Sequence, residues 1–200
     1  DYRQALRCKL PEAEAARVRY QLVALLMERG DIPEARQHCD VLLKASVDAN
    51  SNELVALINA ELMFREGHFE ESMEIIERLL KSNPNSTVAL MIRGFLHFEA
   101  GKFSAAIEDL QTVVQKDPYN QRAHYKLGQA LQKTQQPDAA AIHFRRSEEL
   151  IGLSSEIMVA RNLLANQPGD RTLRQRLAEL NERRGDFREA ARWRQMINRP

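Results

Sequence analysis

A short motif recurs along this 200-residue chain at a nearly constant interval. In four of the five copies it begins with glycine; most copies have an apolar or aromatic third residue, and all end on a small residue. The copies are 30–35, 67–72, 101–106, 135–140 and 185–190, and only the last step is clearly longer than the others. A period of roughly 34 residues is typical of stacked helical hairpins, which more often bind partners than catalyse reactions. The motif therefore predicts an all-α repeat architecture.

Each copy of the motif separates two stretches that have the apolar spacing of amphipathic helices. The glycine suits the left-handed residue that ends a first helix, and the last, small residue lets the second helix lie close against the first. Another small residue precedes four of the motif starts by one constant interval, at Ala60, Gly94, Gly128 and Ala178. The motif aromatics Phe69, Phe103 and Phe187 are expected to fill the hairpin corners.

Prolines mark the same period independently. Pro84, Pro118 and Pro168 precede the motif starts at 101, 135 and 185, and the interval is the same in all three cases. Proline cannot continue a preceding helix but is tolerated in the first turn of the next one. These prolines are therefore expected at the joints between hairpins.

The pattern resembles the tetratricopeptide repeat family, most completely at Gly94, Gly101, Phe103, Ala106 and Pro118. The chain departs from the family by lacking its early tryptophan, by Val23 at a small-residue position and by Gln135 at a glycine position. The resemblance implies a right-handed superhelical solenoid of antiparallel helix hairpins. It also implies that the first helices of the hairpins line a concave groove for peptides or protein segments.

The spacing predicts one array over residues 1–200, with hairpins at 13–46, 50–82, 85–117, 119–150 and 170–198. Residues 1–10 are expected to be the second helix of a truncated hairpin, because Tyr2 and Ala5 match the second half of the motif. Further repeats are expected upstream in a longer parent protein.

The last step of the motif, from 135 to 185, equals one repeat plus about half a repeat. Residues 154–167 have the register of a second helix but no first helix of their own. Ser154 and Ser155 followed by Glu156 favour a new helix start, which predicts an extra helix over 154–167. The alternative is one long, bent helix over 138–167. An extra helix would turn the last hairpin out of line with the others.

Charge and cysteine content are ordinary. The formal net charge is +1, which argues against general nucleic-acid binding. Residues 171–200 hold nine arginines and four acids, and these charges are expected to form a solvated helix surface.

Cys8 and Cys39 are expected to be buried, reduced thiols. No apolar run approaches the roughly 18 residues that a membrane span requires.

Catalytic patterns are missing from the sequence. It contains no phosphate-binding glycine loop, no His-Glu-x-x-His, no Cys-x-x-Cys and no Gly-x-Ser-x-Gly. The five histidines lack metal-ligand spacing, and His97 is expected to be a hydrogen-bonded core residue. No enzymatic activity, cofactor or metal is therefore expected.

Carried over from the family, the inward-facing positions predict a groove on hairpins two to four that is apolar in its middle and basic beyond it. The predicted partner-binding residues are Leu57, Glu61, Phe64, Met91, Phe95, Phe98, Arg122, Tyr125, Lys126 and Gln129. Leu54 and Val88 are expected to be buried between hairpins instead. Phe95→Ala, or Met91→Glu with Phe98→Glu, is expected to abolish binding while leaving the melting temperature nearly unchanged.

The predicted function is a non-catalytic protein–protein interaction scaffold that binds a partly apolar protein or peptide segment. The alternative is a structural or self-association module of a larger protein, with helical-repeat RNA binding a distant third. The compartment is undetermined, with the cytoplasm as the default for a chain that shows no signal segment.

Overall fold

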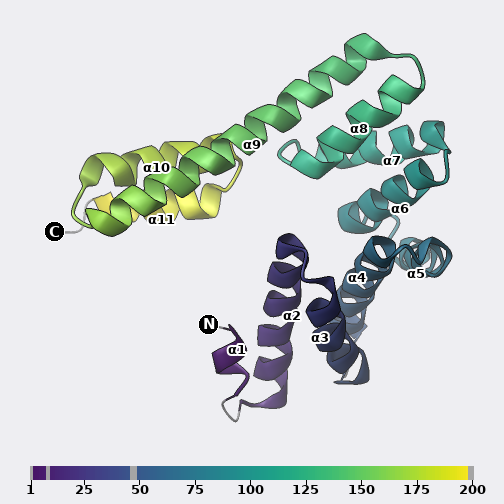
Figure 1. The fold of residues 1–200 in the computed structure, drawn as a ribbon, viewed down its shortest axis with the longest axis horizontal. Helices are drawn as coiled ribbons and strands as arrows, with labels where there is room; N and C mark the ends of the chain where they lie inside the picture. Colours follow the sequence, from purple (N-terminus) through teal and green to yellow (C-terminus); the bar gives the residue numbers. More distant parts are fainter. Residues whose placement is uncertain (1, 8–9, 46–48, 198–200) are drawn as a thin grey trace. The chain divides into compact units, whose positions relative to one another are not determined.

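The computed structural model describes residues 2–7, 10–45 and 49–197, without the side chains of residues 49–52. This part of the chain contains helices and no strand (Figure 1). The helices are α1 (Tyr2–Ala5), α2 (Glu12–Arg29), α3 (Ile32–Ala45), α4 (Ala49–Glu66), α5 (Phe69–Ser82), α6 (Thr87–Glu99), α7 (Phe103–Lys116), α8 (Gln121–Lys133), α9 (Pro137–Asn166), α10 (Arg171–Arg183) and α11 (Phe187–Ile197). The chain divides into two compact units, residues 1–109 and 110–200, with the boundary inside α7. None of the described helices combines the length and apolar character that a membrane crossing requires.

The turns inside the hairpins have the backbone that the motif predicts. Gly30, Gly67, Gly101 and Gly185 all have positive φ, between 72° and 86°. Gln135 occupies the equivalent turn at φ 61°, which makes it the only non-glycine residue with positive φ in the described chain. Left-handed backbone crowds the Cβ of an ordinary residue, so Gln135 holds its turn under strain. The joints between hairpins are also confirmed, since Pro84, Pro118 and Pro168 each lie between a second helix and the next first helix.

In the first unit, the small residues bring α4 and α5 into close contact. Ala60 and Ser72 are both fully buried, and the Ser72 hydroxyl donates a hydrogen bond of 2.7 Å to the Ala60 carbonyl. A larger side chain at either position would push the two helix axes apart. The core of the neighbouring hairpin is built from residues of α2, α3 and α4, namely Leu22, Val23, Leu26, Met27, Ala35, Cys39, Leu42, Val55, Ile58 and Leu62.

In the second unit, the same kind of contact joins α8 to α9. A Cβ added at Gly128 would lie 2.8 Å from the Phe144 ring, closer than side chains tolerate. Tyr125 packs against the same ring at a tilted angle of 59°, with a centroid distance of 5.8 Å. Gln121 donates to the buried Ser147 hydroxyl at 2.8 Å. α8 therefore packs along the N-terminal half of α9.

The predicted extra helix over 154–167 is wrong. α9 runs unbroken from Pro137 to Asn166 and passes through Gly152. The Ser154 hydroxyl does not cap a new helix but donates to the Leu150 carbonyl at 3.0 Å, one turn earlier in the same helix. The half-repeat is thus absorbed by lengthening one helix. Its C-terminal half packs on α10, where Leu150, Leu153 and Leu164 share a core with residues of that helix.

Tyr119, in the turn before α8, contacts the last hairpin. Its ring meets the Phe187 ring edge-on at a centroid distance of 6.1 Å, and a Cβ at Gly185 would lie 2.3 Å from it. The guanidinium of Arg146, on α9, lies 5.4 Å from the centre of the Tyr119 ring. Phe187 therefore packs against another hairpin, whereas Phe69 and Phe103 pack within their own on Phe64 and Phe98.

The strained turn at Gln135 gives a stability prediction. Gln135→Gly should raise the free energy of unfolding by about 1 kcal/mol, because glycine tolerates positive φ. The reciprocal change Gly101→Gln should lower it by a similar amount, since no atom lies within 4 Å of the added Cβ and only the backbone conformation opposes it. Thermal or urea unfolding of both variants measures these effects. Two changes of the same sign would contradict this explanation.

Cys39 gives a second prediction. Its side chain is fully buried, and this burial raises the pKa of the thiol to about 11. Because the thiolate is the reactive form, a Cys8→Ser variant should leave Cys39 inert to a thiol reagent at pH 8 until the protein unfolds. Cys8 itself lies outside the described residues. Rapid labelling of native Cys39 would show that the α3 core opens readily.

Candidate partner-binding site

The predicted binding residues of the first unit lie on α4 and α6, and they differ in exposure. Leu57, Met91 and Phe95 are buried, with Phe95 only 4% exposed. Glu61, Phe64 and Phe98 are half-buried. The apolar middle of the predicted site is therefore largely part of the core.

The aromatic residues form contacts that tie this surface to the hairpin turns. Phe64 lies 5.6 Å from Phe69 and 5.9 Å from Phe95 between ring centres, and Phe98 meets Phe103 edge-on at 5.3 Å. Removing a buried ring typically costs about 3–5 kcal/mol. Phe95→Ala is thus expected to destabilise the fold, so the prediction that this variant leaves the melting temperature nearly unchanged does not survive the observed burial.

Leu54 and Val88 show the opposite deviation. They were expected to be buried between hairpins, but the structure leaves 47% of Leu54 and 45% of Val88 exposed. The two residues are one repeat apart and take the same place on α4 and α6. Leu54 is the sixth residue of α4 and Val88 the second residue of α6, and each lies on the helix face that carries Leu57 or Met91 almost one turn later. The exposed apolar surface therefore lies one turn away from the predicted one.

Charges next to this surface are paired within the chain. Arg65 donates to the Glu61 carboxylate at 2.9 Å and to the Met27 carbonyl at 2.9 Å. Arg36 forms an ion pair of 2.6 Å with Glu66 and also donates to Asn59. These contacts hold α4 to α2 and α3. They also balance the negative charge of Glu61.

A buried carboxylate joins α6 to α7. Asp109 accepts two hydrogen bonds from Arg93, at 2.8 and 2.6 Å, and this contact raises the pKa of the arginine. His97 Nε2 lies 3.9 Å from the same carboxylate, and burial lowers the pKa of His97. His97 Nδ1 is buried without a hydrogen-bond partner. The expectation of a hydrogen-bonded core histidine therefore does not hold at this nitrogen.

The predicted residues of the second unit lie on α8. Tyr125 is exposed over about half of its surface, while Arg122, Lys126 and Gln129 are half-buried. The Gln129 Oε1 atom is buried and accepts no hydrogen bond. Tyr125 therefore offers the most accessible apolar surface of this group.

A histidine pair between α8 and α9 was not anticipated from the sequence. The Nδ1 atoms of His124 and His143 lie 3.0 Å apart, and His124 Nε2 lies 3.2 Å from the Pro118 carbonyl oxygen. Burial lowers the pKa of both histidines, so both are neutral at neutral pH, with His124 donating to Pro118 and His143 donating to His124. The sequence held one signal for this contact. His143 lies one repeat after Asp109, so it takes the place on α9 that Asp109 takes on α7. Among the described residues no group of three or more acidic, histidine or cysteine side chains could hold a metal ion.

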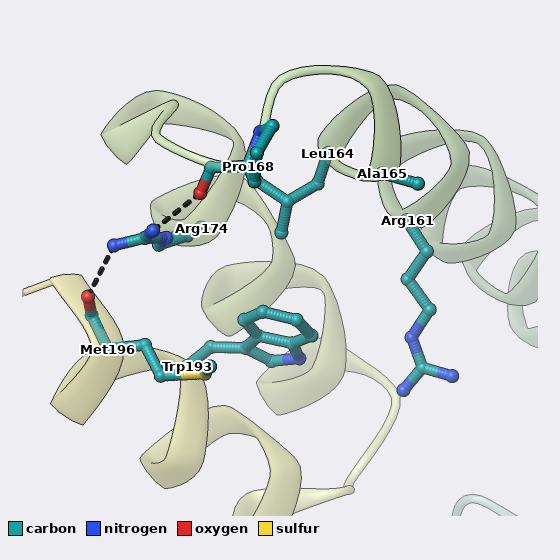
Figure 2. A pocket seen from close by; sticks show the side chains of 7 residues that line it. All are labelled: Arg161, Leu164, Ala165, Pro168, Arg174, Trp193 and Met196. Carbon is teal, nitrogen blue, oxygen red and sulfur yellow. Dashed lines mark hydrogen bonds between the residues drawn. The ribbon is translucent and has the colours of Figure 1, made fainter.

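The second unit also contains a pocket of about 340 Å³ at its last hairpin (Figure 2). It is lined by Arg161, Leu164, Ala165, Pro168, Arg174, Trp193 and Met196. Arg174 spans one end of the pocket by donating to the Met196 and Pro168 carbonyls. The indole Nε1 of Trp193 is buried without an acceptor. The lining is mainly apolar, and no sequence motif predicted it.

Comparisons with curated proteins place short stretches of the chain beside much longer relatives. Tetratricopeptide repeat protein 21B of Xenopus laevis is 28% identical over 78 residues, which is 39% of this chain and 6% of that protein. The CTR9 homolog of Arabidopsis thaliana is 30% identical over 105 residues, which is 52% of this chain and 9% of that protein. The chain spans less than a tenth of either relative.

Solved structures share the fold at low identity. MamA from Desulfovibrio magneticus RS-1 is 18% identical with a TM-score of 0.50, and the match covers 91% of this chain and 92% of that one. A monomeric mutant of IFIT1 with Gppp-AAAA is 15% identical with a TM-score of 0.56, covering 98% of this chain and 56% of that one. These likenesses support the predicted all-α solenoid of antiparallel hairpins.

Two sequence profiles described as tetratricopeptide repeat match residues 60–146 and 16–40. The matched residues include three of the glycine turns, the small-residue contacts of α4 with α5 and of α8 with α9, and the joints at Pro84 and Pro118. The chain belongs to the tetratricopeptide repeat family.

Proposed function

We propose that this protein–protein interaction scaffold recruits a partner segment through the exposed face of its first helices α4 and α6. The observation that carries the proposal is the exposure of Leu54 and Val88 at equivalent positions of successive repeats. Large apolar side chains that recur on one surface are typical of interaction sites. A partner segment with two apolar side chains would meet one of them on each repeat.

The half-buried residues of the same helices extend this surface. Phe64 and Phe98 are also one repeat apart, and each rests on the aromatic residue of its own hairpin turn. Aromatic side chains held in place by neighbours bind with little loss of conformational entropy. In this proposal Leu57, Met91 and Phe95 support the surface from beneath, because they are buried.

The residues on α8 form a second proposed contact, considered on its own. Tyr125 offers an exposed ring that Phe144 supports at 5.8 Å. Arg122 and Lys126 are cations on the same helix and would favour an acidic side chain in the partner. Gln129 brings a buried amide oxygen without a donor, which a partner side chain could satisfy after a small movement.

RNA binding is the other class of function that a helical repeat could serve. The IFIT1 structure with the similar fold is one with Gppp-AAAA. This chain has a formal net charge of +1, and its exposed first-helix positions in the first unit include the apolar Leu54 and Val88. Phosphate-rich ligands are bound mainly through cationic surfaces. The described surface therefore favours a protein partner.

The proposal predicts the effect of charge at the two exposed positions. A peptide selected from a random library against this protein should bind at least about tenfold more weakly to the Leu54→Glu/Val88→Glu variant, because the apolar contacts would be replaced by hydrated carboxylates. Fluorescence anisotropy with the labelled peptide measures the dissociation constant. Both positions are exposed, so the melting temperature should remain within a few degrees of the wild type.

The matched control is Val41→Glu/Leu43→Glu on the second helix α3, where two apolar residues are exposed to a similar extent. This variant carries the same added charge and should bind the peptide with wild-type affinity. Equal affinities for all three proteins would show that the partner does not use α4 and α6. Equal losses in both variants would show that the added charge alone weakens binding.

A further inference from the structure

The pocket of about 340 Å³ at the last hairpin has no role in partner binding by α4 and α6. We call this cavity, which is lined by residues of α9, α10, α11 and the turn before α10, the Trp193 pocket. Figure 2 shows the indole of Trp193 in the middle, with Arg161 on one side and Arg174 on the other. Volumes of this size are within the range of natural ligand sites. The pocket is therefore large enough for a large apolar side chain.

Arg174 places a positive charge at the pocket without a carboxylate to balance it. Its guanidinium donates to the Met196 carbonyl at 2.7 Å and to the Pro168 carbonyl, and the residue is half-buried. Among the described residues, these carbonyls are its partners and no acidic side chain pairs with it. A guanidinium has five N–H donors, so two bonds leave donors for a ligand. An incoming carboxylate would meet a cation that is already held in place.

Arg161 supplies a second cation, and it shares its acidic partner with another arginine. Glu189 accepts a hydrogen bond from Arg161 at 3.4 Å and one from Arg192 at 3.2 Å. The Arg161 side chain is 48% exposed. Because Arg192 would still balance Glu189, Arg161 is able to turn to the carboxylate of a ligand without leaving an acidic group unpaired. The pocket thus has an available cation on each side of an apolar centre.

The charge of the whole last hairpin favours an anionic ligand. Residues 171–200 contain nine arginines and four acids. The acids already have partners within the hairpin or on α9, since Glu182 pairs with Arg194, Asp186 with Arg184, and Glu189 with Arg161 and Arg192, while Glu179 accepts from Gln175. The excess of arginine is therefore not neutralised within the described hairpin. It should attract acidic groups towards the pocket.

The lining between the two arginines disfavours a nucleotide base. The side chains of Leu164, Ala165 and Pro168 carry no hydrogen-bonding atom, and the indole Nε1 of Trp193 is buried. The Pro168 and Met196 carbonyls already accept hydrogen bonds from Arg174. A base inserted here would lose the hydrogen bonds of its polar edges to water without replacing them. An aliphatic or phenyl side chain has no such bonds to lose.

We propose that the Trp193 pocket binds an acidic peptide segment of a partner protein, which inserts one large apolar side chain over the indole and places carboxylates beside Arg161 and Arg174. A small molecule with one carboxylate would engage one arginine, whereas a peptide supplies acids on both sides of the apolar side chain. The pocket is lined mainly by the helices α9 and α11 and lies in the second unit. This proposal does not depend on partner binding by α4 and α6.

Trp193 is the only tryptophan of the chain, so its fluorescence reports on this pocket directly. The probe is the blocked peptide Glu-Asp-Glu-Leu-Glu-Asp-Glu, titrated into the whole chain. We expect a saturable change in Trp193 emission with a micromolar dissociation constant that rises with salt concentration. Peptides with serine in place of leucine, or with lysine in place of the acids, should bind at least about tenfold more weakly. No change in emission up to millimolar peptide would overturn the proposal, and so would equal binding of all three peptides.

A matched pair of arginine variants tests the charge contact. Arg161→Glu should weaken binding of the leucine peptide at least about tenfold, because a carboxylate would face the acids of the peptide. Arg176→Glu is the control, since Arg176 is also 48% exposed and also pairs with one carboxylate, that of Glu156, but does not line the pocket. Both variants change the net charge equally. Equal losses of affinity would show that overall charge, and not the pocket, attracts the peptide.

A second pair of variants tests the apolar contact without removing a core residue. Ala165 and Ala141 are both exposed on α9, and of the two Ala165 lines the pocket. Ala165→Phe should occupy the pocket and weaken peptide binding at least about tenfold, whereas Ala141→Phe should leave it unchanged. Both melting temperatures should stay within a few degrees of the wild type. Wild-type affinity of folded Ala165→Phe would contradict insertion of a side chain into the pocket.

Competition identifies the class of ligand. Isocaproate, a small acid with a leucine-like chain, and a single-stranded adenosine oligonucleotide should each displace the peptide only at concentrations far above that of the peptide. Displacement by either at equal concentration would overturn the assignment of a peptide. The Leu54→Glu/Val88→Glu variant should bind the acidic peptide with wild-type affinity, so the site on α4 and α6 and the Trp193 pocket are tested separately.

Discussion

The close approach of two helices at small residues is the contact on which each hairpin depends. Ala60 and Ser72 allow α4 and α5 to come near enough for a side chain of one to bond the backbone of the other. Gly128 allows α8 to lie against the Phe144 ring of α9. Once the two helices are this close, the turn between them must be short, and a residue with positive φ is what reverses the chain in that space. The exposed surfaces follow from this packing, since it decides which side of each first helix faces its own second helix.

The long helix α9 shows what happens when the repeat period is broken. A new helix after residue 153 would require its first amide groups to find partners outside the helix. The chain instead continues the hydrogen bonding of α9, and Ser154 bonds to the Leu150 carbonyl. Continuity avoids unsatisfied amides but leaves one helix face without the first helix that covers it in other hairpins. Val159 and Leu163, which remain exposed, lie on that face.

The sequence was sufficient for features that depend on local chemistry. Glycine turns, proline joints and small-residue contacts each have few residue types that satisfy them, and Gln135 shows that the turn keeps its conformation even where glycine is missing. Exposure was harder to predict because it depends on neighbouring hairpins. Leu54 and Leu57 have the same side chain on the same helix, yet the first is exposed and the second is buried. The His124–His143 contact and the Trp193 pocket likewise require positions in space that no short motif encodes.

The central claim is that partner segments bind to the first helices α4 and α6 rather than to the second helices of the same hairpins. Hydrogen–deuterium exchange of the whole chain, with and without a selected peptide, tests this claim most directly. Binding should slow amide exchange in peptides from α4 and α6 around Leu54 and Val88, and it should leave α3 and α5 unchanged. Protection confined to the second helices, or to α9 to α11, would contradict the account.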